Sequence, residues 1–147
     1  MSYLALGLGL VVLALAGLHA VWALGATWPA ADAAELSTMV VGAPGLTQMP
    51  PAGMTGLVAA ALGVAGWLVL ASGGWAPWPL GDVLLRVGLG GLTAVFLGRG
   101  LATYLMGGFW AREVYPFARL DRLYYAPLCL LLGVGTGALL IARWVAL

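Results

Sequence analysis

The feature that most constrains this chain is a set of four apolar runs, each long enough to cross a bilayer as a helix. They cover residues 3–24, 54–71, 83–106 and 125–142. A spanning helix needs about 20 residues to cross the hydrocarbon core. Only 7% of the 147 residues are charged, whereas soluble domains carry about 25%. We therefore predict an all-α polytopic membrane protein, a single four-helix transmembrane bundle spanning residues 1–147.

The few charged and thiol groups exclude several classes of function. Six arginines and no lysine stand against five acids, for a net charge of +1. That charge is too small to attract nucleic acid, so we expect no nucleic-acid partner. Cys129 is the single cysteine, which excludes an intrachain disulfide, a CxxC redox pair and a thiolate zinc site. We expect no metal site.

Four crossings place both termini and the short loop near residues 73–81 on one side, here called side A. The two longer connections, residues 25–53 and 107–124, fall on the opposite side, side B. In the first of them, Asp32 followed by Glu35 is typical of a helix start and predicts a short interfacial helix through about Val40. We expect this connection to cover the side-B mouth of the bundle.

Location follows from weaker signals. Arginine in place of lysine and abundant Ala, Gly and Leu are typical of GC-rich bacterial genomes, which favours the bacterial inner (cytoplasmic) membrane. The arginine count differs little between the two sides, and it slightly favours cytoplasmic termini. Membrane lipids are the expected partners.

Two ionisable residues lie inside the predicted spans, where such groups are costly and often functional. His19 and Arg99 lie at similar depths below side B, and Trp22 shares a helix face with His19. We therefore predict a polar and aromatic pocket at side B. The other candidate binding residues near this mouth are Tyr104, Glu113, Asp121, Arg122 and Tyr124.

Structural roles remain open for the same residues. His19 is also consistent with a structural role as a hydrogen-bonded residue within its helix. Arg99 is also consistent with an ion pair to Glu113 or Asp121, in place of binding an anionic ligand. Asp121 also fits the N-cap of the fourth helix. We expect no cofactor, the alternative being haem bound by His19 across a dimer interface.

Two segments carry a family resemblance. Residues 19–25 read HAVWALG and residues 117–133 read FARLDRLYYAPLCLLLG. With four spans around them, they resemble the bacterial membrane family labelled DUF3995, a domain of unknown function. Ala26 stands where that pattern suggests a second glycine. The resemblance implies a four-helix membrane fold over most of the chain and brings no assigned activity.

The leading hypothesis is a small integral membrane protein that binds a lipid-like or amphipathic ligand in the side-B pocket, with Arg99 holding any anionic group. Whether it is an enzyme stays open; if it is, His19 is the expected general acid or base. The alternative is a non-catalytic accessory or structural subunit of a larger membrane complex or homo-oligomer. A pocket requires His19 and Arg99 to face one cavity, whereas a packing subunit requires a filled interior.

Overall fold

The computed structural model describes residues 1–43, 48–105 and 115–145, and helices make up its regular structure. The four long helices are α1 (Ser2–Ala23), α3 (Ala52–Ser72), α4 (Gly81–Leu105) and α6 (Ala126–Val145). Each lies in a segment long and apolar enough to cross a membrane. No strand occurs in the part of the chain that the structure describes. The predicted all-α architecture with four apolar helices is confirmed.

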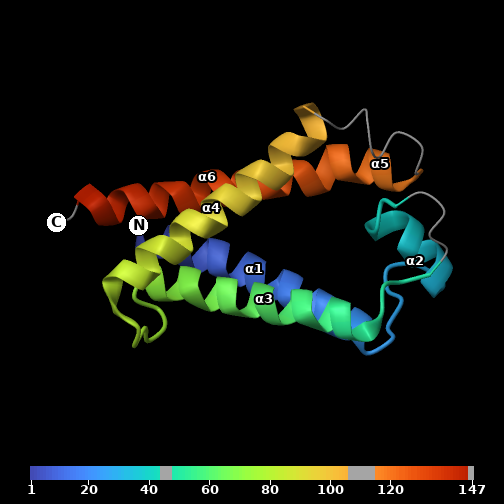
Figure 1. Cartoon of the computed structure of the whole chain (residues 1–147), viewed down its shortest axis with the longest axis horizontal. Coiled ribbons are helices and arrows are strands. Elements are labelled where there is room, and N and C mark those ends of the chain that lie inside the picture. The colour runs from blue at the N-terminus through green and yellow to red at the C-terminus, as the bar shows by residue number, and fades with distance from the viewer. Residues whose placement is uncertain (44–47, 106–114, 146–147) are drawn as a thin grey trace.

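The first pair of helices consists of α1 and α3, which run side by side along their length (Figure 1). Glycines at the contact leave room for leucines of the opposite helix. A Cβ atom added at Gly9 would lie 2.6 Å from Leu70, and one added at Gly66 would lie 2.7 Å from Leu13. Small residues allow this close approach, which is the main source of helix association in lipid.

The second pair, α4 and α6, packs through the same kind of reciprocal glycine–leucine contact. A Cβ atom at Gly100 would lie 2.7 Å from Leu130, and one at Gly133 would lie 2.7 Å from Leu97. The Thr93 hydroxyl donates to the Thr136 hydroxyl across the pair, at 3.1 Å. The two pairs are therefore the packing units of the molecule.

The pairs join mainly in their side-A halves. A Cβ atom at Gly135 of α6 would lie 2.6 Å from Leu8 of α1, and Gly88 of α4 faces Leu68 of α3 in the same way. Figure 1 shows the pairs closest near the chain termini and farther apart towards the other end. The loop between α3 and α4 lies with the termini, and α2 (Ala33–Val40) lies at the wide end. The placement of the two long connections on one side of a membrane stays a prediction, and residues 107–114 of the second connection lie outside the described residues.

The short helix α2 begins as predicted. The Asp32 carboxylate accepts a hydrogen bond from the Glu35 N–H at 2.8 Å, and the Glu35 carboxylate accepts from the Ala31 N–H at 2.8 Å. The first bond satisfies an N–H group of the first turn, which has no partner within the helix, and the second ties the residue before the N-cap to that turn. Leu36 is fully buried beneath the helix, so α2 is packed against the bundle.

The fourth helical segment is longer than the sequence predicts. It begins as α5 (Phe117–Leu120), passes through one π-helical stretch, η1 (Asp121–Tyr125), and continues as α6. In η1 the Ala126 N–H bonds to the Asp121 carbonyl, five residues back. Pro127 follows directly and cannot donate to an α-helical ladder, so a local π-turn accommodates it. Residues 117–124, predicted as part of a connection, are therefore helical.

Candidate functional site

A cavity of about 450 Å³ lies between the two helix pairs in the side-B half. Its volume is within the range of small-molecule sites. Side chains from both pairs, from α2 and from the chain after α1 form its walls. They are Leu15, Leu18, His19, Trp22, Trp28, Pro29, Met39, Val40, Val58, Leu62, Phe96, Arg99, Phe117, Tyr125, Leu128 and Cys129. His19 and Arg99, which come from different pairs, thus line one cavity.

His19 is held in a defined tautomer by its own helix. Its Nδ1 lies 2.8 Å from the Leu15 carbonyl oxygen. A carbonyl oxygen can only accept, so Nδ1 carries the hydrogen, and Nε2 of the neutral ring is an acceptor. Among the described residues, Nε2 has no hydrogen-bond partner. The ring also packs at 5.1 Å, centroid to centroid, from Trp22.

Trp22 ties the following chain segment to the cavity wall. Its indole N–H donates to the Trp28 carbonyl at 2.7 Å. Because of this bond the chain after α1 folds back against the helix, and Trp28 and Pro29 reach the cavity. The sequence singles out Trp22 but not the two residues that it positions.

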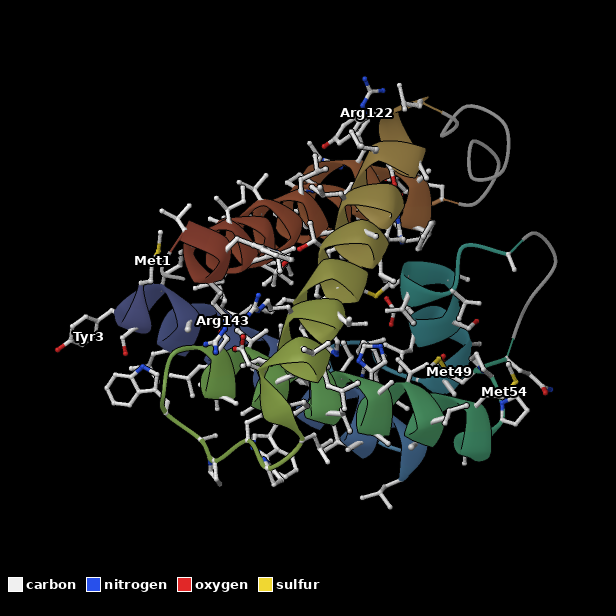
Figure 2. The ribbon with its side chains drawn as sticks, turned by 60° about the vertical axis from the view of Figure 1, so that its left-hand side comes forward. Met1, Tyr3, Met49, Met54, Arg122 and Arg143 are labelled. Carbon is white, nitrogen blue, oxygen red and sulfur yellow. The ribbon has the colours of Figure 1, made fainter. Side chains whose placement is uncertain are left out.

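A second cavity, of about 280 Å³, adjoins the first at His19. The two share His19, Trp22, Val40 and Val58. The remaining walls come from the residue after α2, the chain before α3 and the first turns of α3, and they are Val41, Met49, Pro50, Met54 and Thr55. Figure 2 shows Met49 and Met54 close together near the start of α3. His19 therefore stands between two spaces at side B.

Arg99 is already paired with protein groups. Its Nη2 donates to Asp121 at 2.5 Å, and its Nη1 donates to the Thr103 hydroxyl at 2.8 Å. Thr103 in turn donates to the second Asp121 oxygen at 2.7 Å. The Asp121 side chain is only 6% exposed, so this three-residue network replaces most of its hydration.

This network gives Arg99 a carboxylate partner among the described residues. Of the two carboxylates considered for Arg99, Asp121 is the one that it contacts, while Glu113 lies outside the described residues. The N-cap role of Asp121 is wrong, because the helix already runs through this position and no side-chain cap is made. The carboxylate is instead held by α4.

The remaining predicted residues lie apart from the cavity. The Tyr104 hydroxyl donates to the Arg122 carbonyl at 2.9 Å, which links α4 to η1 on the outer surface. Arg122 points away from the helices in Figure 2, and Tyr124 is exposed. Of the predicted binding residues, the cavity brings together His19, Trp22 and Arg99.

Sequence reasoning missed Phe117 and Tyr125, which form the far wall of the cavity. The Tyr125 hydroxyl donates to the Met39 carbonyl at 3.2 Å, so this residue also fastens α2. Phe117, Asp121, Tyr125 and Cys129 recur every four residues. That spacing puts them on one helix face, and it becomes visible once the helix is taken to start at Phe117.

Metal ligands do not gather in the parts of the chain that the structure describes: no three His, Cys, Asp or Glu side chains lie together there. Haem bound by His19 across a dimer needs a second chain and stays a prediction, as does the absence of a cofactor.

One comparison with known proteins gives a match. The model of a family described as "Protein of unknown function (DUF3995)" matches residues 12–136. The match includes both segments that carry the resemblance, residues 19–25 and 117–133. No curated protein and no solved structure matches the chain.

Proposed function

This chain belongs to the DUF3995 family of unknown function, and we propose from its own site that it binds an amphipathic, lipid-like ligand with an uncharged polar end. The ligand occupies the side-B cavity between the two helix pairs. The observation that carries the proposal is the position of His19 and Arg99 on one cavity of about 450 Å³.

The composition of the walls supports an apolar body for the ligand. Most of the cavity lining is aliphatic or aromatic, with Trp22, Trp28 and Phe96 among the larger side chains. An apolar cavity with few polar groups favours ligands of matching character, and the polar groups set their orientation. Such a ligand is drawn from the surrounding lipid.

The polar groups of the cavity support an uncharged head. The charge of Arg99 is neutralised by Asp121, and its Nη1 donates to Thr103. An anion placed beside Arg99 would have to compete with a nearly buried carboxylate, at a large cost in desolvation. His19 Nε2 is the acceptor left without a partner among the described residues, so a hydroxyl or amide N–H of the ligand donates to it.

A catalytic role for His19 is the second candidate, favoured by one observation. The Leu15 carbonyl fixes the ring tautomer with Nε2 as acceptor, which is the arrangement a general base needs towards a hydroxyl proton. In this candidate function His19 moves a proton of the bound ligand.

We place the protein in the bacterial inner membrane with cytoplasmic termini.

The ligand is tested by extracting the protein in mild detergent and recording native mass spectra. We expect a bound mass in the wild type and a loss of occupancy by about tenfold in His19→Phe, which keeps an aromatic ring but removes Nε2. Leu10→Ala on the exposed face of α1 is the matched control and should retain the ligand. Melting temperature in the same detergent shows whether each variant is folded.

Two results would contradict ligand binding in the side-B cavity. One is a wild-type protein that carries no ligand; if it also purifies as a homo-oligomer or with a stoichiometric partner, the accessory-subunit alternative is supported. The other is occupancy that His19→Phe leaves unchanged. A bound molecule that proves anionic would overturn the uncharged head.

A further inference from the structure

A second polar cluster lies at side A, where two arginines share one carboxylate. Arg143 of α6 donates to one Asp82 oxygen through Nε at 3.1 Å and also through Nη2. Arg86 of α4 donates to the other oxygen through Nε at 2.5 Å and also through Nη2. Arg143 Nη1 donates to the Ser72 carbonyl at the end of α3, at 3.0 Å.

The charges of this cluster do not balance. Two guanidinium groups carry +2 and the Asp82 carboxylate carries −1, which leaves +1. The two arginine side chains are only 16% and 31% exposed, so water compensates this charge only in part. Arg86 Nη1 has no acceptor among the described residues and retains donors for a further oxygen. The cluster is therefore chemically suited to a second anion.

Space for that anion is present. An open cavity of about 720 Å³ is lined by Met1, Ser72, Asp82, Arg86, Leu139, Ala142 and Arg143. Figure 2 shows Met1 and Arg143 at the same end of the molecule. Unlike the side-B cavity, this one presents two arginines, which suit the planar, multidentate recognition of phosphate.

The depth of the cluster matches that of lipid headgroups. Asp82 stands in the first turn of α4 and Arg143 in the last turn of α6. Trp75, Trp78 and Trp144 lie at this same end, and tryptophan prefers the membrane–water interface. Arg86 also stacks over the Trp144 ring, 4.9 Å from its centroid, which keeps the guanidinium at this level.

We propose that Arg86 and Arg143 bind a phosphate group at side A, presented by the headgroup of an anionic phospholipid. Asp82 bridges the two guanidinium groups and competes with the phosphate for their hydrogen bonds. The proposal uses no residue of the side-B cavity, so it holds or fails independently of the function proposed above.

The experiment is a titration of the full chain in detergent with phosphatidylglycerol, followed by native mass spectrometry. Arg86→Gln and Arg143→Gln should each weaken binding by about tenfold, because each removes charge-assisted hydrogen bonds. Arg122→Gln removes the same charge from the exposed side-B surface and should leave binding unchanged. Diacylglycerol, which lacks the phosphate, should not bind at the site.

Asp82→Asn separates binding from a purely structural role. It removes the competing carboxylate and leaves both arginines in place, so phosphatidylglycerol should bind more tightly in this variant. A structural role alone predicts weaker or unchanged binding. Melting temperatures identify variants that do not fold, and any one of the three side-A variants that folds is sufficient for the test.

Further measurements distinguish a phospholipid headgroup from free inorganic phosphate as the ligand of this site. Displacement of the lipid by millimolar inorganic phosphate would assign the site to the free anion and overturn the lipid assignment, whereas resistance to it supports the headgroup. Equal binding of diacylglycerol, or wild-type affinity in both arginine variants, would overturn the site itself.

Discussion

At the scale of single residues, an ion pair at the edge of the side-B cavity, between Arg99 and Asp121, is formed by the protein alone. Arg99, Thr103 and Asp121 satisfy one another, and of the described side-chain nitrogen and oxygen atoms that are fully buried none lacks a partner. Unpaired charges within a membrane span are costly. The role of this network is therefore to join α4 to η1 at the edge of the cavity.

Asp121→Asn tests that role. The change leaves the Arg99 charge without its partner, and because the Arg99 side chain is 42% exposed we expect a loss of about 1–3 kcal/mol, less than for a fully buried pair. The measurement is the melting temperature in detergent. The double variant Arg99→Met with Asp121→Leu removes both charges and should recover most of the loss; a single variant as stable as the wild type would contradict this account.

The sequence places His19 and Arg99 at one depth, but it does not identify the partner of Arg99. Hydropathy measures depth along a span and carries no information on rotation about the helix axis. Glu113 and Asp121 are both near side B, and the choice between them depends on where the fourth helix begins. That start, at Phe117, is obscured by the charged residues Arg119, Asp121 and Arg122, which resemble a loop in composition.

At the scale of elements, leucine–glycine contacts allow the long helices to pack closely, both within the two pairs and between them. Within each pair a glycine on one helix receives a leucine from the other, as Gly66 receives Leu13 and Gly133 receives Leu97. Other glycines, such as Gly91 and Gly98, have nothing within 4 Å of an added Cβ. Composition alone does not separate these two sets, which is why the sequence predicts close packing without predicting the pairs.

Gly133→Ala is the sharpest test of these contacts. The new Cβ would lie 2.8 Å from the Leu97 backbone nitrogen, which cannot move aside as a side chain can. We expect a loss of about 1–3 kcal/mol from overpacking, seen as a lower melting temperature in detergent. Gly91→Ala adds the same methyl group to open space and should leave stability unchanged or slightly raised. Equal effects of the two substitutions would contradict the packing described here.

At the scale of the whole molecule, the chain termini and the loop between α3 and α4 lie at one end and α2 lies at the other (Figure 1). The four long helices and the start of α2 are predictable because each depends on a local signal in the sequence. For the long helices the signal is an apolar run long enough to cross a bilayer, and for α2 it is the Asp32–Glu35 pair. The cavity walls at Phe117 and Tyr125 are not, because they depend on the docking of helices far apart in the sequence.

Sidedness is tested by cysteine labelling in sealed vesicles. In a Cys129→Ala background, Ser2→Cys at side A and Ala31→Cys at side B should react with a membrane-impermeant maleimide from opposite faces, since both positions are exposed. Cysteine-free protein provides the control. Labelling of both positions from the same face would refute the four-span topology.

The division into two helix pairs has a consequence for biosynthesis. A chain leaves the ribosome from its N-terminus, so the α1–α3 pair is complete before α4 has been made. Leu128 and Cys129, in the last helix, complete walls that begin at Leu15. The side-B cavity therefore cannot exist in the membrane until synthesis is nearly finished, and no folding intermediate made of the first pair alone can hold the proposed ligand.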